Sequence, residues 1–582
     1  MHPALPTWPP HLSNTTSTSH GDASGLQSSA SSVVNVDMGE GMLVRDVDAE
    51  VEVEVGEGEA GPGSAVGHIE AGFSNEEARR NLRDQLKRSL SQMAVNDDAS
   101  TAIDNLPPRE YYVLTDAGKP VFTSGTKRGH DELASAIGLM QAIISVFIDD
   151  GDKLRCINAG DTRITFLLRS PLYYVCVSAW REPESVTRSH LEYLHLQILS
   201  VVSAAQLRRI FEKRTNFDLR RLLTGAETFL HSLLARLETD LAMSTSSLLC
   251  LKLDAALRTR AAEALVPGSK MKDILYVVLV ARERVVTLVR PKKHSVHPSD
   301  LHILLNTIHA PSIFDSPASW LPICLPKFNP AGFLHAYVSF PQEEEEEGGG
   351  REGEGEPTTP KPRIVDPRPD LSVEAEDVAT PTADRSEATR DKNDAPAELA
   401  RIEREKGRGE RVGLGFVCVS GGGEFESIRE WSEGVLKKLE TDHVLAGIRS
   451  AVRSGSTEYT AADVGVPGLR HFVYKSRALV QVTMPVLEEP YRSVEGRRRL
   501  VTLYQRLHDA IHAKSGQEGP LKLQYIQTER ESVMGWITQP FELYICLPPR
   551  LPKSAVVGAA NAVTRWVKQE ESRLFLRDAP VF

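Results

Sequence analysis

The sequence predicts an α+β protein built from three units, in each of which helices pack on an antiparallel sheet. Three observations support this fold class. Short strand-like runs and amphipathic helical runs alternate in a similar order three times along the chain. Polar, acidic stretches precede and interrupt these units. The 582 residues are 41% hydrophobic, which is enough for several packed cores.

The stretches outside the three units are acidic. Residues 1–107 contain 17 acidic and 6 basic side chains, and residues 343–410 contain 21 and 11. The whole chain has a net charge of −11, so the remaining residues together carry about +10. We expect a disordered tail at 1–107 and a disordered insert at 342–410, because such compositions bury too little apolar surface to offset the entropy of ordering. Within the tail, a capping box and leucines at helical spacing predict a short basic amphipathic helix at 75–94.

The first unit, residues 108–245, begins with a β-hairpin and ends with helices. The hairpin is predicted at 111–122, with its turn at 116–118. The next elements are a helix at about 131–148, strands at 153–158, 162–168 and 172–180, and helices at about 184–203 and 204–211.

The other two units have related orders. The second, residues 246–341, has predicted strands at 274–281 and 284–289, a helix at 298–308, and strands at 322–325 and 333–340. The third, residues 411–582, opens with a strand at 413–420. Its later elements are helices near 425–453, strands at 472–475 and 480–484, a helix at 493–514, strands at 522–527, 533–538 and 541–547, and a helix at 554–573.

The helix at 131–148 has more apolar surface than one sheet face needs. At 100° per residue its apolar side chains cover an arc of about 200°, and packing on a sheet requires only about half of that. The remaining apolar surface should pack against either other helices of the same chain or the sheet and helix of a second domain. This helix is therefore our candidate for contact with a protein partner.

The six cysteines indicate a reducing compartment. None forms a C-x-x-C pair, and most lie in apolar runs, so we interpret them as reduced core thiols. The first thirty residues show no secretory signal, and the longest apolar run, 133–148, is short for a membrane span. We therefore expect a soluble cytosolic protein.

A search for catalytic motifs gives no candidate residues. The sequence has no P-loop, no H-E-x-x-H helix and no G-x-S-x-G nucleophile elbow. The three glycines at 421–423 are interpreted as a turn rather than a phosphate cradle, and the 17 histidines show no convincing metal-ligand spacing. We expect no catalytic residues, no metal and no cofactor.

Several segments resemble the Mon-one (SAND) vacuolar fusion family, in family order from about residue 110 to the C-terminus. They include 111–122 (YYVLTDAGKPVF), 218–225 (DLRRLLTG), 321–333 (LPICLPKFNPAGF), 469–476 (LRHFVYKS) and 541–546 (FELYIC). The resemblance implies three longin domains, at 108–245, 246–341 and 411–582. It also implies an obligate heterodimer with the Ccz-one protein.

The family resemblance implies a function as well. The heterodimer would be a guanine-nucleotide exchange factor that activates the late-endosomal/vacuolar Rab GTPase for membrane fusion, vacuolar protein transport and autophagy. The chain would be cytoplasmic and peripherally bound to late endosome, multivesicular body and vacuole membranes. Exchange of this kind requires only tighter binding to the nucleotide-free Rab, without an acid or base. A longin-domain trafficking adaptor or tether scaffold without exchange activity is the alternative.

Two sets of residues are candidates for binding. For the Rab or the partner subunit we expect contacts around the first domain's helix and neighbouring strands, at Glu132, Ser135, Leu139, Gln141, Ile143 and Trp180. The net-positive folded part favours anionic partners, meaning phosphoinositide membranes, nucleic acid or an acidic protein face. The resemblance selects phosphoinositide membranes and excludes nucleic acid. We expect membrane contacts at Arg290, Lys292, Lys293, Arg497, Arg498 and Arg499.

Overall fold

The computed structural model describes most of the three units. The described residues are 107–125, 130–149, 151, 154–341, 363–364, 412–422, 424–515, 519–549 and 551–577. The tail, including the helix expected at 75–94, lies outside the described residues, as does nearly all of the 342–410 insert. Within that insert, β11 (Arg363–Ile364) forms a short strand parallel to β9 of the second sheet. The expectation of a wholly disordered insert is therefore wrong at these two residues.

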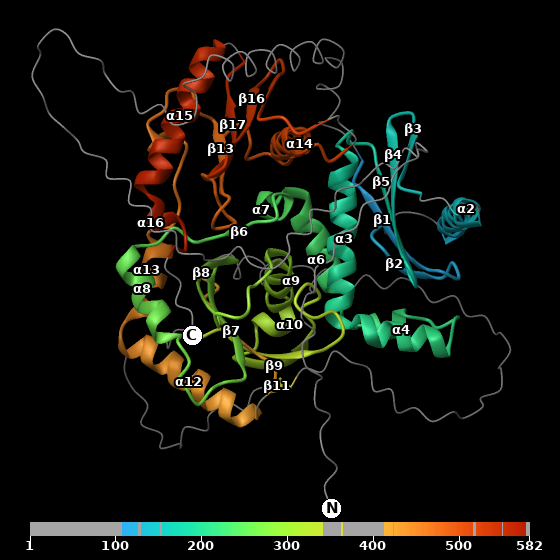
Figure 1. Cartoon of the computed structure of the whole chain (residues 1–582), viewed down its shortest axis with the longest axis horizontal. Coiled ribbons are helices and arrows are strands. Elements are labelled where there is room, and N and C mark those ends of the chain that lie inside the picture. Colours follow the sequence, from blue (N-terminus) through green and yellow to red (C-terminus); the bar gives the residue numbers. More distant parts are fainter. Residues whose placement is uncertain are drawn as a thin grey trace, which may run out of the picture. The chain divides into compact units, whose positions relative to one another are not determined.

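The first unit is a five-stranded antiparallel sheet in the order β2-β1-β5-β4-β3 (Figure 1). Its strands are β1 (Glu110–Thr115), β2 (Pro120–Thr123), β3 (Cys156–Ala159), β4 (Thr162–Arg169) and β5 (Leu172–Ser178). The helix α2 (His130–Asp149) packs on one face and α3 (Glu184–Val201) on the other. Alternation along β1 produces this division, since Tyr112 and Leu114 pack with α2, whereas Tyr111 and Val113 pack with α3.

Four further helices complete this part of the chain. They are α4 (Ala204–Lys213), α5 (Arg220–Leu223), α6 (Glu227–Thr239) and α7 (Leu241–Ser244). The side chain of Ser203 accepts a hydrogen bond from the Gln206 amide and so caps the start of α4. The helix α6 was not predicted from the sequence, and it packs its buried Leu233 and Leu237 against Tyr193 of α3.

The second sheet has six strands in the order β11-β9-β10-β12-β7-β8. Besides β11 they are β7 (Ile274–Ala281), β8 (Arg284–Val289), β9 (Ala318–Ile323), β10 (Leu334–Ser339) and β12 (Gly415–Ser420). One face packs against α9 (Pro298–Ile308) and α10 (Pro311–Phe314). The other packs against α8 (Ala255–Ala264), α12 (Phe425–Thr441) and α13 (Val444–Arg453).

The position of β12 corrects the expected domain boundaries. We expected this strand to open the third unit at residue 411, but it lies in the middle of the second sheet. Val417 is the register partner of both Val338 in β10 and Val278 in β7. Every residue of β12 is buried, as a central strand covered on both faces requires. The second unit therefore continues beyond residue 411 through α13.

The third sheet has the order β15-β16-β17-β13-β14-β6. Its strands are β13 (His471–Ser476), β14 (Gln481–Thr483), β15 (Leu523–Gln527), β16 (Ser532–Ile537), β17 (Phe541–Leu547) and β6 (Leu248–Leu249). The sheet lies between α14 (Val494–His512) and α15 (Lys553–Gln569). Two short helices, η3 (Ala462–Val464) and α16 (Glu571–Leu574), flank it. Although β6 falls in the sequence range expected for the second unit, it pairs in parallel with β14 and belongs to this sheet.

Candidate functional site

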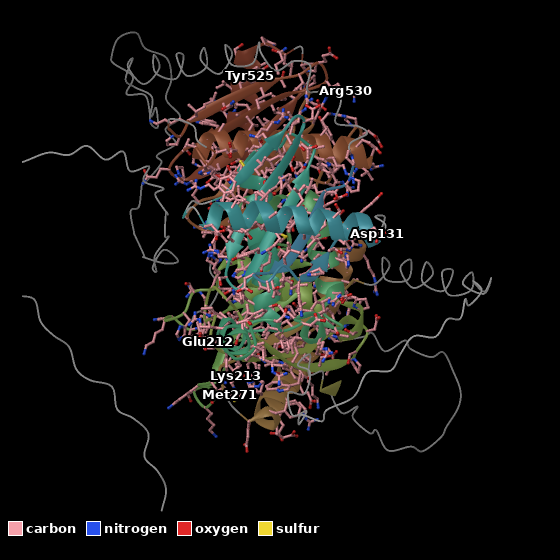
Figure 2. The ribbon with its side chains drawn as sticks, turned by 90° about the vertical axis from the view of Figure 1, so that its right-hand side faces the viewer. Asp131, Glu212, Lys213, Met271, Tyr525 and Arg530 are labelled. Carbon is pink, nitrogen blue, oxygen red and sulfur yellow. The ribbon has the colours of Figure 1, made fainter. Side chains whose placement is uncertain are left out.

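The helix α2 lies on the outside of the first domain and faces the viewer in Figure 2, where Asp131 marks its first turn. Its inward residues Ile137, Met140 and Ile144 are buried against the sheet. In the described residues it is the one helix long and apolar enough to cross a membrane by length and composition. Because its inner face packs on strands of the same domain, we interpret it as a surface helix covered on one side.

The outer face of α2 is also apolar. Leu139 is 62% exposed and Val146 59%, and their seven-residue spacing places them on the same side of the helix, away from the sheet. Ile148, which is 43% exposed, follows the buried Ile137 by eleven residues and so lies on the inner side, at the C-terminal end of α2. Gly138 and Ala142 are exposed beside Leu139 and Val146. Burying a Leu or Val contributes about 1.5–3 kcal/mol, so covering these two partly exposed side chains would contribute roughly 2–4 kcal/mol. We call Gly138, Leu139, Ala142 and Val146 the α2 outer face.

Of the predicted partner-binding residues on α2, some side chains are exposed and others are half-buried. Glu132, Ser135 and Leu139 are exposed, as a contact role requires, and Ile143 is half-buried. Gln141 is half-buried, and its side-chain amide donates a 3.0 Å hydrogen bond to the carbonyl oxygen of Asp116. Gln141 thereby holds the β1–β2 turn against α2.

The expectation that Trp180 contacts a partner is wrong, because its side chain is buried within this chain. The side chain is 2% exposed and its Nε1 donates a 2.7 Å hydrogen bond to the Pro107 carbonyl. The guanidinium carbon of Arg109 lies 3.8 Å from the ring centroid, and that of Arg498 lies 4.8 Å from it. Since Arg498 belongs to α14, Trp180 is part of the contact between the first and third domains.

The predicted membrane-binding residues differ in how exposed their side chains are. Lys292 and Lys293 are exposed in the turn that follows β8, whereas Arg497 and Arg498 are half-buried. Arg290 is 8% exposed and donates to the carbonyl of His294, so its place in the membrane set is wrong.

The membrane-binding role expected for Arg499 is wrong for the same reason, because its side chain is buried. It is 5% exposed, and its Nε lies 2.9 Å from the Glu531 carboxylate. Arg498 forms an ion pair with Glu238 of α6, which engages its cationic end within the chain. The expected cluster of three neighbouring arginines therefore does not form one exposed cationic surface.

A buried charged cluster in the third domain was not predicted from the sequence. His508 and His512, four residues apart on α14, lie beside Glu542 of β17, and the possible ligand atoms are within 4.8 Å of one another. The Lys475 ammonium lies 3.3 Å from the Glu542 carboxylate, and the Lys514 ammonium lies 3.0 Å from His508 Nε2. Two ammonium groups beside the same donor atoms oppose a metal cation by charge repulsion.

Electrostatics in this cluster favour a structural role. Burial raises the pKa of Glu542, but His512 and Lys475 outweigh burial and bring that pKa down to about 2. Burial lowers the pKa of His508 well below its ordinary value, and the neighbouring Lys514 lowers it further. The cluster is a network of an ionised carboxylate, ammonium groups and a neutral histidine. The i, i+4 spacing of the two histidines is the sequence signal that could have indicated it.

Further contacts join the first and third domains near this cluster. The Ser185 hydroxyl, in the first turn of α3, donates to the Asp509 carboxylate of α14, which also accepts from Ser515 at 2.6 Å. The guanidinium of Arg506 donates to the carbonyl oxygen of Arg181 at 3.1 Å. These contacts lie on the α3 side of the first sheet, opposite α2.

Comparison with known protein families agrees with the three sheets. Models of the first, second and third longin domains of FUZ, MON1 and HPS1 match residues 109–233, 272–347 and 468–571, respectively. The third match begins after β12, α12 and α13, in agreement with the placement of these elements in the second unit.

Individual relatives match over most of the chain. Vacuolar fusion protein MON1 of Cryptococcus neoformans var. neoformans serotype D is 45% identical over 515 residues, which are 88% of this chain and 71% of that protein. Vacuolar fusion protein MON1 of Mycosarcoma maydis is 34% identical and covers 86% of this chain and 72% of its own length. Vacuolar fusion protein MON1 homolog A of Homo sapiens is 32% identical over 83% of this chain and 62% of that protein.

Proposed function

This chain belongs to the vacuolar fusion protein MON1 family, and from that premise we propose that it is one subunit of a guanine-nucleotide exchange factor. The partner subunit is the Ccz-one protein, and the substrate is the late-endosomal/vacuolar Rab GTPase. The complex would act in membrane fusion, vacuolar protein transport and autophagy. Its place would be the cytoplasmic surface of late endosomes, multivesicular bodies and vacuoles.

The observation that carries the proposal is the α2 outer face. A helix that packs on its own sheet with one side and exposes Leu139 and Val146 on the other is suited to a second protein surface. The polar side chains of Glu132 and Ser135 are exposed at the N-terminal end of the same helix. An apolar centre with a polar border is the usual composition of a protein interface.

Exchange on such a surface requires no catalytic side chain. A platform that binds the nucleotide-free Rab more tightly than the nucleotide-bound Rab shifts the equilibrium toward nucleotide release. GTP then replaces GDP because it is the more abundant nucleotide. A non-catalytic regulator of this kind is consistent with a longin-domain member of the family.

Membrane attachment is a second part of the proposal. With Arg290 and Arg499 excluded by burial, Lys292 and Lys293 remain as exposed cations of the predicted set. Each exposed lysine near an anionic lipid surface contributes about 1 kcal/mol of attraction, so two alone give weak binding. A phosphoinositide membrane would therefore need further cations of this chain or of the partner subunit.

The decisive measurement is release of fluorescent GDP from the late-endosomal Rab. The arms are this chain alone, this chain with the Ccz-one protein, and the same complex with an early-endosomal Rab. We expect fast release only when both subunits and the late-endosomal Rab are present. A verified complex that does not accelerate release, in solution or on liposomes, would leave the adaptor or tether scaffold as the function.

A charge placed on the α2 outer face tests the surface itself. We expect Val146→Glu to weaken assembly with the partner subunit or the Rab by about tenfold or more, because it removes an apolar contact and desolvates a carboxylate. Val494→Glu is a matched control, since Val494 is 55% exposed on α14 of the third domain. Equal assembly and equal exchange by both variants would exclude the α2 outer face as the contact.

A further inference from the structure

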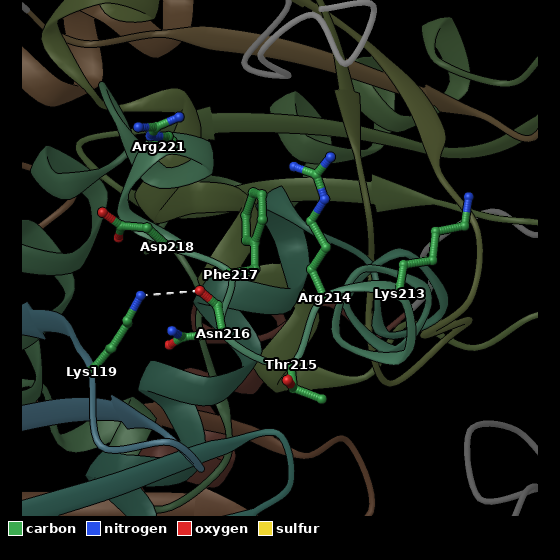
Figure 3. Close-up of a pocket in the computed structure, with 8 residues that line it drawn as sticks. All are labelled: Lys119, Lys213, Arg214, Thr215, Asn216, Phe217, Asp218 and Arg221. Atoms are coloured by element: carbon green, nitrogen blue, oxygen red, sulfur yellow. Dashed lines mark hydrogen bonds between the residues drawn. The ribbon is translucent and has the colours of Figure 1, made fainter. Parts of the chain in front are cut away.

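A basic hollow opens in the first domain between the β1–β2 turn and the loop that joins α4 to α5. It has a volume of about 560 Å³ and is lined by Lys119, Lys213, Arg214, Thr215, Asn216, Phe217, Asp218 and Arg221 (Figure 3). None of these residues belongs to the predicted Rab-binding or membrane-binding sets. We call these eight residues the basic hollow.

Three cations of the basic hollow have no acidic partner among the described residues. Within the part of the chain that is described, no carboxylate lies within 4.0 Å of the cationic groups of Lys213, Arg214 or Arg221. The one acidic side chain of the hollow, Asp218, is held by Arg220 through two hydrogen bonds of 3.0 Å. Those bonds lower the pKa of Asp218. Because Arg220 compensates this carboxylate, the hollow is strongly positive.

Contacts across the chain hold the hollow in shape. The Lys119 ammonium donates a 3.0 Å hydrogen bond to the carbonyl oxygen of Asn216, which ties the β1–β2 turn to the α4–α5 loop (Figure 3). Phe217 packs against the main core cluster and forms an apolar wall between Arg214 and Asp218. The backbone of the hollow is therefore fixed at both ends, which reduces the ordering cost of binding a ligand.

The shape and the cations together define the class of ligand. Guanidinium groups bind phosphate oxygens through two parallel hydrogen bonds, and lysine adds a point charge. A volume of this size lies in the range of small-molecule sites. Three cations around one hollow, without a carboxylate partner in the described part of the chain, match an anion with several charged groups.

We propose that the basic hollow binds a small anion carrying two or more phosphate monoester groups on one ring, either a soluble inositol polyphosphate or the headgroup of a phosphoinositide. This site does not depend on the exchange activity proposed above. It is distinct from Lys292 and Lys293, which belong to the second domain.

The test measures binding of fluorescent inositol hexakisphosphate to the full chain, alone and co-purified with its partner. A second arm measures flotation with phosphatidylcholine vesicles that contain a phosphoinositide, against vesicles with the same charge supplied by phosphatidylserine. Arg214→Gln with Arg221→Gln removes two cations of the hollow. Lys437→Gln with Lys438→Gln removes the same charge from α12 and serves as the control. All four side chains are exposed, so both double variants should keep the melting temperature of the parent protein.

We expect one equivalent of the soluble probe to bind and the Arg214/Arg221 variant to weaken binding about tenfold for each guanidinium removed. The Lys437/Lys438 variant should bind like the parent. Binding to phosphoinositide vesicles alone, with the same dependence on Arg214 and Arg221, would identify the headgroup as the source. Absence of binding in both arms, equal loss in both variants, or equal flotation with phosphatidylserine vesicles would overturn the proposal.

Discussion

Replacing Arg499 by leucine tests whether this residue stabilises the fold or binds a membrane. Its Nε lies 2.9 Å from Glu531 Oε1, and the two side chains are 6% and 0% exposed. The Glu531 carboxylate also accepts from the Thr528 hydroxyl at 3.2 Å. The leucine variant would leave a buried carboxylate with that hydroxyl but without its cation.

The size of the effect follows from burial. Removing one member of a buried ion pair costs about 3–5 kcal/mol, because the remaining charge loses its compensation. Replacing both members by apolar residues of similar volume is often close to neutral. We therefore expect Arg499→Leu to be strongly destabilising and the double variant with Glu531→Leu to recover most of the loss. Lys292→Leu, at an exposed position, should change stability by about 0.5 kcal/mol or less.

The assay is hydrogen exchange of the β16 amides, since a chain with three domains need not unfold in a single transition. Arg499→Leu should accelerate exchange across Ser532–Ile537, and the double variant should slow it again. Vesicle binding is measured on the same samples. Unchanged protection of β16 together with weaker vesicle binding would refute the structural role and restore Arg499 to the membrane set.

Two further predictions concern two buried carboxylates whose pKa values are shifted in opposite directions. The Glu542 carboxylate has its pKa lowered from 4.5 to about 2, so it contributes about 3 kcal/mol of stability above pH 4.5 that is lost as the pH falls toward 2. In thermal unfolding, Glu542→Gln should therefore be destabilised at pH 7 and approach the parent in acid; a pH-independent difference would contradict this. Burial raises the pKa of Asp300 from 3.8 to about 6, so its contribution is present below pH 3.8 and lost as the pH rises through 6. Asp300→Asn should remove that part of the stability–pH slope, and an unchanged slope would contradict the assignment.

Local sequence patterns predicted most elements of the fold. Short strand-like runs bounded by turn residues located β1, β4, β5 and β17 close to their observed bounds. Such runs and turns are properties of neighbouring residues, so no knowledge of distant segments is needed. The α2 outer face was expected for the same reason, because an apolar arc on a helix is a local property.

Sheet membership could not be predicted in the same way. Every residue of β12 is buried, so the strand has no polar face to indicate a neighbour, and its partners lie about 80 and 140 residues earlier, in β10 and β7. The two-residue strands β6 and β11 are too short to carry any periodicity. These three strands account for the errors in the expected boundaries.

The predicted binding residues were wrong where contacts between distant segments of the chain determine which side chains are buried. A run of three arginines on α14 has the appearance of a basic surface, but helical geometry points successive residues in different directions. Arg499 turns toward Glu531, whereas Arg498 turns toward Glu238 and Trp180. Neither acidic partner is near them in sequence, so only the tertiary structure assigns these side chains to the interior.

The helices that pack on the sheets are buried to different extents in the three domains. Every residue of α9 except Pro298 is buried, and most of α14 is buried. Among the α2 side chains that the structure describes, only Ile137, Met140 and Ile144 are buried, although the sequence of α2 is comparably apolar. The first domain already contacts the third through α3 and Trp180, so the chain uses the opposite side of that sheet for its own assembly. We therefore expect the outer side of α2 to contact a surface outside the described residues, which the Val146→Glu variant tests.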